Sequence, residues 1–221
     1  AKAALRALAK TAGGKEVTPL LERLTSTRDA EVRSEAGNAA AQALARIDQP
    51  ARRSVLVRDA LGWAQSVDSR NALLGLLPGC GDATALAALK TAAADSDFRV
   101  RDAAVRALAD WPDASAWQAL TGIYRQPGSE AVRALALRGL VRLAGDENAH
   151  PGPGLIEHYR QLLAGAHSDA DLRLILGALG GAVQPEALDL ALPLLANPGV
   201  RAEAEVAVKK IAEAVKAQYP K

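Results

Sequence analysis

The sequence predicts an all-α fold, an α-α superhelix in which about six antiparallel helix pairs stack side by side. Hydrophobic residues make up 49% of the chain but aromatic residues only 3%, so small apolar side chains dominate, as close helix packing requires. An arginine-centred motif recurs six times, and turns rich in Gly and Pro separate the segments between. Together these observations indicate a helical repeat protein.

The repeated arginines are spaced 28 to 40 residues apart, within the range of helical repeats. They are Arg33, Arg70, Arg101, Arg133, Arg173 and Arg201. The fourth residue before each arginine has a side chain suited to capping a helix N-terminus. These residues are Asp29, Ser66, Asp97, Ser129, Asp169 and Asn197. We therefore predict that each motif opens the second helix of a pair.

An apolar stripe accompanies each arginine at helical spacing. Positions −1, +3 and +7 relative to the arginine are apolar or small in the repeats, with Ser69 as the one polar residue. These positions share one helix face, which predicts the buried side of each second helix. The arginine flanks that face, so we expect it to bond to a cap carboxylate or a loop carbonyl, forming a ladder along the stack.

Amphipathic segments between the motifs predict the first helix of each pair. They span residues 19–26, 52–65, 83–94, 115–125, 155–165 and 186–196. A leading helix is expected at 2–11 and a terminal helix ending near Tyr219. We interpret residues 1–221 as a single solenoid domain and as a fragment of a longer chain, because the sequence lacks Met and opens like a helix interior. The Pro/Gly-rich loop 145–154 is the candidate position for a bend.

The pattern Asp-x-x-Val-Arg-x-x-Ala followed by Leu, most complete at 97–108, resembles the HEAT repeat. The stretches ALADWPD (107–113), ALRGLVRLAGD (136–146), LGALGG (176–181) and PEALDLALPLL (185–195) are similar to HEAT regions of large, often exported bacterial proteins. Some of those proteins carry a 3-keto-glycoside hydrolase-type domain, but no β-rich segment of that kind occurs here. The resemblance implies a protein-binding scaffold in an exported or periplasmic protein, with the cytoplasm as the alternative.

Charge and hydropathy narrow the class of partner. The formal net charge is +2, and acidic and basic residues are interspersed, so the basic footprint of a nucleic-acid or membrane-surface binder is missing. No run approaches the roughly 18 consecutive apolar residues of a membrane span. We therefore expect a protein partner or a neighbouring domain of the same chain.

The residues that carry chemistry form no known catalytic or metal-binding pattern. The histidines His150, His158 and His167 lack the spacing of zinc ligands. Cys80 stands alone without a sequence-local base, and Glu157 and His158 are adjacent on a helix and so point in different directions. Nucleotide-binding and serine-hydrolase motifs are also missing. The sequence predicts no enzyme, no metal and no cofactor.

Two alternative functions remain open, and three tryptophans bear on the first of them. Trp63, Trp111 and Trp117 could stack on bases, as aromatics do in HEAT-like DNA glycosylases, although packing between repeats is the preferred interpretation. A DNA-binding protein would also need a basic stripe. The further alternative is a phycobilin-lyase-like HEAT protein, for which neither nucleophile nor acid pair is visible.

The helix face opposite the apolar stripe is the predicted concave, partner-binding surface. Offsets +1, +5 and +8 from the arginine define it at about 100° per residue. The candidate binding residues on or near this face are Asn38, Asn71, Arg106, Arg138 and Arg142. Arg138 and Arg142 are the expected bidentate donors to an acidic partner, and a solvated helix face is the alternative. Later repeats place Leu174, Ala178 and Val206 there instead.

Overall fold

The computed structural model describes residues 2–126, 129–149 and 151–218. Within these ranges the chain forms thirteen α-helices and three short 3-10 helices, and no strand. The chain divides into two compact units, with the boundary between Ala119 and Leu120 inside α8. The all-α fold predicted from the sequence is confirmed, and each unit is described by itself below.

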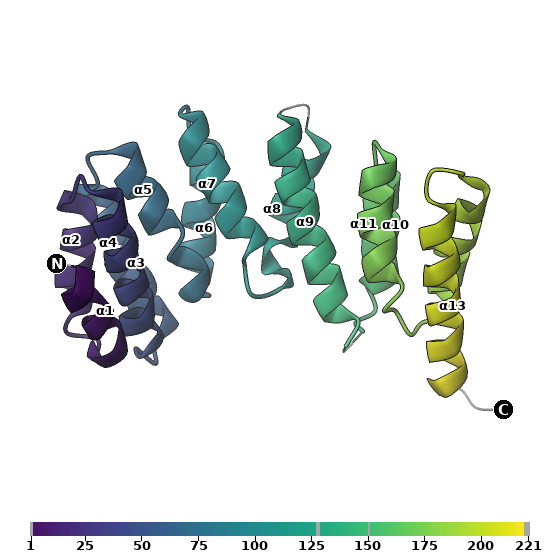
Figure 1. Ribbon diagram of the computed structural model, residues 1–221, viewed down its shortest axis with the longest axis horizontal. Helices are drawn as coiled ribbons and strands as arrows, with labels where there is room; N and C mark the ends of the chain where they lie inside the picture. The colour runs from purple at the N-terminus through teal and green to yellow at the C-terminus, as the bar shows by residue number, and fades with distance from the viewer. Residues whose placement is uncertain (1, 127–128, 150, 219–221) are drawn as a thin grey trace. The chain divides into compact units, whose positions relative to one another are not determined.

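The first unit is built of helix pairs that follow a leading helix. Its helices are α1 (Lys2–Thr11), α2 (Val17–Ser26), α3 (Ala30–Ala45), α4 (Pro50–Trp63), α5 (Val67–Leu74), α6 (Ala83–Ala92) and α7 (Phe98–Ala109), with 3-10 turns at η1 (Leu77–Gly79) and η2 (Ala114–Ala116). The first helices α2, α4 and α6 pack on one another, and the second helices α3, α5 and α7 do the same. This gives two layers of helices, visible at the purple to blue-green end of Figure 1.

The second unit repeats this arrangement. Its helices are α8 (Trp117–Arg125), α9 (Glu130–Glu147), α10 (Leu155–Ala164), α11 (Asp169–Leu179), α12 (Glu186–Ala191) and α13 (Arg201–Gln218), with a 3-10 turn η3 (Leu192–Ala196) after α12. The second helices α9, α11 and α13 are neighbours, and the first helices α10 and α12 contact each other (Figure 1). All six predicted helix pairs are therefore present.

The predicted apolar stripe forms the core. At +3, Ala36, Ala104, Ala136 and Ala204 are fully buried. Small side chains at this position let neighbouring helix backbones approach closely, which explains why the chain relies on Ala. Ser69, the polar exception, is also buried, and its hydroxyl donates to the Thr25 carbonyl at 3.1 Å. The buried hydroxyl is thus satisfied by a neighbouring repeat.

Side-chain caps begin three of the predicted second helices. Asp29 Oδ1 accepts from the backbone N–H of Glu31 at 2.9 Å. Ser66 Oγ accepts from Ser69, and Asp97 Oδ1 accepts from Arg99. Each cap satisfies at least one of the backbone donors that the first helical turn leaves unpaired, and Asp29 satisfies two.

The other three predicted caps differ in detail. Ser129 stands at the N-cap of α9 but its side chain makes no capping bond. Ser168, one residue before the predicted Asp169, caps α11. Asn197 ends η3, and its side chain accepts from the Gly199 N–H in the turn that precedes α13. In these three repeats the side-chain cap is missing, is shifted by one residue, or is replaced by a bond within the preceding turn.

The arginine ladder is formed by two kinds of contact. Arg33 donates to the Thr27 carbonyl at 2.8 Å, and Arg101 donates to the Asp95 carbonyl at 2.8 Å, so each holds the turn of its own repeat. Arg70 departs from the pattern, because it forms no ion pair or side-chain hydrogen bond with a described residue.

Other contacts of these arginines reach the next repeat or stay on one helix. Arg33 lies 3.6 Å from the Asp68 carboxylate on α5. On the last helix, Arg201 pairs with Glu205 one turn onward. The loop-carbonyl partner expected from the sequence is found, but the expected cap carboxylate is not, because the carboxylates near these arginines lie within helices.

Three sequence expectations need further comment. Trp111 and Trp117 are buried, whereas Trp63 at the end of α4 is 45% exposed, so the packing interpretation is wrong for Trp63. Helix α9 runs to Glu147, which leaves a shorter loop than 145–154. Tyr219 lies outside the described residues. Among the described helices, none combines the length and apolarity needed to span a bilayer.

Candidate functional site

The predicted binding residues lie on second helices of both units. Asn38 on α3 and Arg106 on α7 are exposed, and Asn71 on α5 is half-buried. Arg138 and Arg142 lie on α9 in the second unit. The predicted alignment of Arg106 with Arg138 joins residues of separate units and stays a prediction.

The α9 arginines differ in their contacts. Arg142 Nη1 lies 2.8 Å from the Asp146 carboxylate one turn onward, so its guanidinium is already engaged. Arg138 is exposed and forms no ion pair with a described residue. Of the two expected bidentate donors, Arg138 therefore has the freer guanidinium.

Cys80 is unsuited to nucleophilic chemistry. The residue is buried, and its Sγ lies 3.8 Å from the Leu76 carbonyl oxygen. Burial raises the pKa of the thiol to about 11, because the thiolate would lose its hydration. Since the thiolate is the reactive form, almost none is present at neutral pH.

The adjacent residues Glu157 and His158 do not form an acid–base pair. His158 Nδ1 lies 3.0 Å from Glu147 Oε2 at the end of α9. Glu157 instead contacts Arg160, and the hydrogen bond from this arginine lowers the pKa of the carboxyl group. Among the described residues no cluster of His, Cys, Asp and Glu could hold a metal ion, and His150 lies outside them.

A buried charge cluster joins α9 to α11. Arg133 donates to Glu130 at 2.7 Å and to Asp171 at 2.8 Å, and its guanidinium lies 5.3 Å from the centre of the Tyr124 ring. Burial alone would raise the pKa of Asp171, but the N–H of His167 and the Arg133 guanidinium outweigh it and lower the pKa. Arg133, Asp171 and Tyr124 are all buried, so the cluster is a structural contact between repeats.

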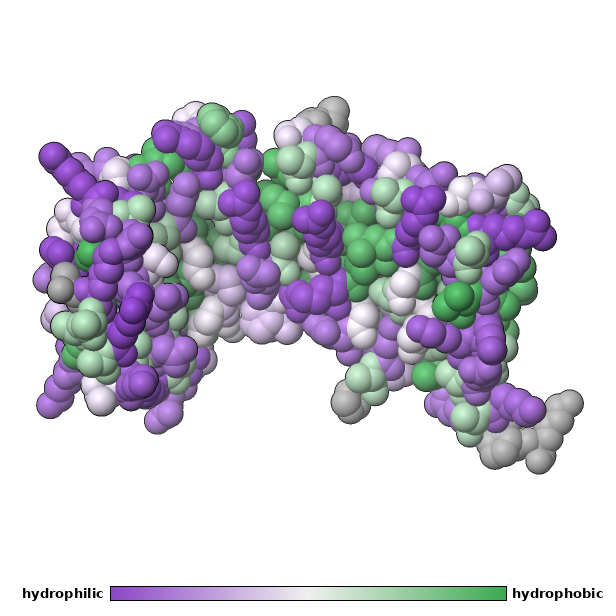
Figure 2. Space-filling view, viewed as in Figure 1, coloured by the Kyte–Doolittle hydropathy of each residue, from purple (hydrophilic) through white to green (hydrophobic). Residues whose placement is uncertain are grey.

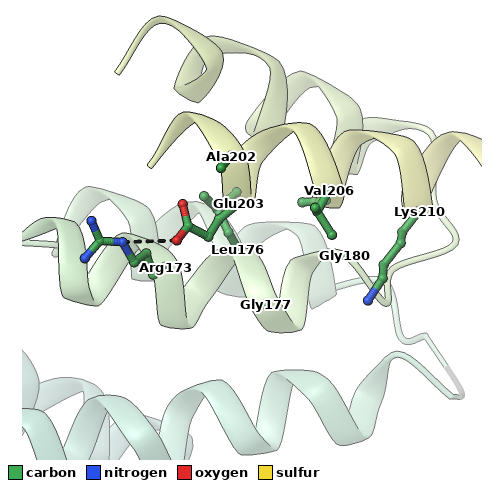
Figure 3. Close-up of a pocket in the computed structure, with 9 residues that line it drawn as sticks. Arg173, Leu176, Gly177, Gly180, Ala202, Glu203, Val206 and Lys210 are labelled. Atoms are coloured by element: carbon green, nitrogen blue, oxygen red, sulfur yellow. Dashed lines mark ion pairs between the residues drawn. The ribbon is translucent and has the colours of Figure 1, made fainter. Parts of the chain in front are cut away.

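An open groove lies between α11 and α13. It has a volume of about 260 Å³. Its lining residues are Arg173, Leu176, Gly177, Gly180, Ala202, Glu203, Val206, Ala207 and Lys210. Figure 3 shows Arg173 and Glu203 at one end, and Val206 and Lys210 projecting from α13 at the other.

Two glycines on α11 shape this groove. A Cβ added to Gly180 would lie 3.4 Å from Ala207 Cα, so α11 and α13 lie close together at this residue. A Cβ added to Gly177 would have no atom within 4 Å, so this residue leaves open space above the helix. The groove is therefore open at the exposed Gly177 and narrow at the buried Gly180.

Apolar side chains are exposed around the groove. Val206 on α13 is 54% exposed. Leu174, which follows the groove residue Arg173 on α11, is 38% exposed. In the second unit, Figure 2 shows apolar surface beside α11 and α13, bordered by hydrophilic residues. The sequence placed Leu174 and Val206 on the partner-binding face, but the groove itself was missed.

Comparison with protein families agrees with the repeat pattern. The family described as HEAT repeats matches residues 59–141. That segment of the chain is built of HEAT repeats. The matched segment covers the complete α6/α7 HEAT repeat and flanking helices, and the arginine motif continues the pattern on both sides.

Comparison with solved structures finds a similar fold in lipovitellin. A lipovitellin structure aligns with a TM-score of 0.62 at 19% identity, covering 93% of this chain and 24% of that chain. An engineered protein aligns at 22% identity (TM-score 0.47, 98% of this chain and 66% of that chain). A designed armadillo repeat protein aligns at 17% identity (TM-score 0.40, 95% and 92%).

These likenesses concern the fold alone. The chain spans about a quarter of the length of the lipovitellin chain. No curated protein matches its sequence.

Proposed function

We propose that this HEAT-repeat chain is a non-catalytic scaffold that binds a protein or a neighbouring domain through the exposed face of its second helices. HEAT and armadillo-like repeats typically mediate protein interaction. The groove between α11 and α13 carries the proposal, because it combines an open apolar floor with exposed Val206 on that face. A recessed apolar surface of this kind accepts side chains of a partner.

The side chains that could carry out chemistry are buried or bonded to other residues, which supports a binding role over a catalytic one. Cys80 is buried and protonated at neutral pH, His158 contacts Glu147, and the Arg133–Asp171 pair is buried. The groove itself is lined by no histidine, cysteine or aromatic residue. It therefore offers no aromatic platform on which bases would stack.

A photo-crosslinking amino acid at Val206 tests this function. The intact protein carrying the crosslinker at Val206 should form an adduct with a defined protein, or with a domain of its own chain, in cells of the source organism. The same crosslinker at Asp189, an exposed residue of the first helix α12, is the matched control. Absence of a Val206 adduct, or an equal adduct from Asp189, would contradict a second-helix binding face.

We also propose that the partner is a neighbouring domain in a larger, exported or periplasmic protein. The resemblance to HEAT regions of large bacterial proteins supports this. Peptide mapping of the Val206 adduct distinguishes the cases, because a domain of the same chain yields an intrachain crosslink. Recovery of the protein in the cytoplasmic fraction would contradict export.

A further inference from the structure

We propose that the α11/α13 groove receives a peptide segment that carries a large apolar side chain and, close to it, a carboxylate. This inference rests on the proposed scaffold function and specifies the chemistry of the partner. The shape of the groove, the charges at its two ends and the empty space at Gly177 each support it.

The size of the groove fits a side chain better than a small-molecule ligand. A cavity of about 150 Å³ holds a benzene-sized group, and pockets for small molecules span about 300 to 1,000 Å³. At about 260 Å³ the groove lies between these values. One Phe or Leu side chain can occupy it while the peptide backbone stays in solvent.

The charged residues that line the groove favour a negatively charged group on the partner. Arg173 Nε lies 3.2 Å from Glu203 Oε1, so these opposite charges compensate each other (Figure 3). Lys210, which also lines the groove, forms no ion pair with a described residue. One positive charge is therefore left uncompensated, and a carboxylate is its natural complement.

The same charges set the direction of the peptide. The Arg173–Glu203 pair carries no net charge at its end of the groove, whereas the Lys210 ammonium attracts a carboxylate. The apolar side chain would then lie over Gly177, where a Cβ meets no atom within 4 Å. The acidic residue would lie toward the C-terminal half of α13. The groove thus recognises an apolar–acidic pair in a defined orientation.

A substitution that fills the groove with a side chain tests the proposal directly. Gly177→Leu places a side chain in the open space, and because no atom lies near the new Cβ, we expect the fold to be retained. The matched control is Gly122→Leu on α8 in the same unit, where a Cβ also meets no atom and which does not line the α11/α13 groove. Both variants replace a helical glycine by leucine, so a difference between them reports on the groove.

Selection from a random peptide library displayed on phage provides the test, with the intact 221-residue chain as bait. We expect selected peptides to combine Phe or Leu with a neighbouring Asp or Glu. Gly177→Leu should weaken their binding at least about tenfold, the effect of losing one buried anchor. Gly122→Leu should leave binding unchanged. Lys210→Glu should weaken the acidic peptides and favour versions with Lys in place of the acid.

Several outcomes would overturn the proposal. Failure to enrich any peptide, enrichment without acidic residues, or equal binding to the Gly177→Leu variant would each exclude an apolar–acidic ligand in this groove. Displacement of bound peptides by oleate at lower concentrations than by free peptide would assign the groove to fatty acids instead. If the peptides bind Gly177→Leu normally, the proposed groove ligand is wrong. The scaffold function is then tested separately by the Val206 crosslinking experiment.

Discussion

Arg133 on α9 and Asp171 on α11 form a buried ion pair, with 2.8 Å between Nη2 and Oδ2, that joins two successive second helices. Arg133→Ala should destabilise the protein by about 3 kcal/mol, because the variant leaves a buried carboxylate without its partner. Chemical denaturation measures this change. Arg173→Ala, which removes a half-exposed pair with Glu203, should cost at most about 1 kcal/mol. Equal losses in the two variants would show that the Arg133 pair is not special.

The helix caps allow a matched comparison. Asp97 accepts from the Arg99 N–H at 2.9 Å, so Asp97→Ala should lower the free energy of unfolding by about 1 kcal/mol. Ser129 occupies the corresponding position of α9 but makes no capping bond, and Ser129→Ala should have almost no effect. Thermal melts of both variants check this difference. A Ser129→Ala loss as large as that of Asp97→Ala would argue against the side-chain bond as the cause.

Alkaline pH should weaken the fold through buried groups. Burial raises the pKa of Cys80 to about 11 and that of Tyr159 to about 12, above the unfolded values near 9 and 10. A raised folded pKa contributes stability that is fully present below the unfolded pKa and is lost as the pH rises through the folded one. Urea unfolding should therefore show constant stability from pH 7 to 9 and a decline above it.

A Cys80→Ala variant separates the two groups. Its decline should begin nearer pH 10, where the Tyr159 contribution starts to be lost. The native thiol should also react slowly with a disulfide reagent at neutral pH. Rapid reaction of Cys80 at pH 7 without unfolding would contradict its burial.

Two glycines should respond oppositely to alanine. A Cβ at Gly165, which follows α10, would lie 2.5 Å from Cε1 of the buried Tyr124 ring. Gly165→Ala should cost about 1 to 3 kcal/mol, because the ring must shift in a packed site. Gly122 on α8 has open space around the same position, so Gly122→Ala should stabilise the helix by up to about 1 kcal/mol. Differential scanning calorimetry of both variants tests the sign.

Local sequence rules predicted the repeats well. The period of the arginines and the residues at −4 located the second helices, and the leading helix agrees with α1 at both ends. These features depend on near neighbours in the chain, such as the cap bond of Asp29 to Glu31. Interactions across a few residues can be read from one sequence because spacing alone determines them.

Features that depend on distances between helices could not be predicted. The groove requires that Gly177 face open space while Gly180 contacts Ala207, although both glycines belong to the same LGALGG stretch. Trp63 was expected to pack, but it stands at the end of α4, where its ring stays 45% exposed. In both cases the position of a neighbouring helix decides the outcome, and the residue types do not reveal it.

The arginine bonds to loop carbonyls have a mechanical consequence. Arg33 and Arg101 each tie their second helix to the turn just before it, through Thr27 and Asp95, so these bonds link segments only six residues apart. Pulling on the chain ends would load the contacts between helix pairs before it loads these short internal links. We expect the force–extension curve to rise and fall repeatedly, with each fall releasing the length of one helix pair.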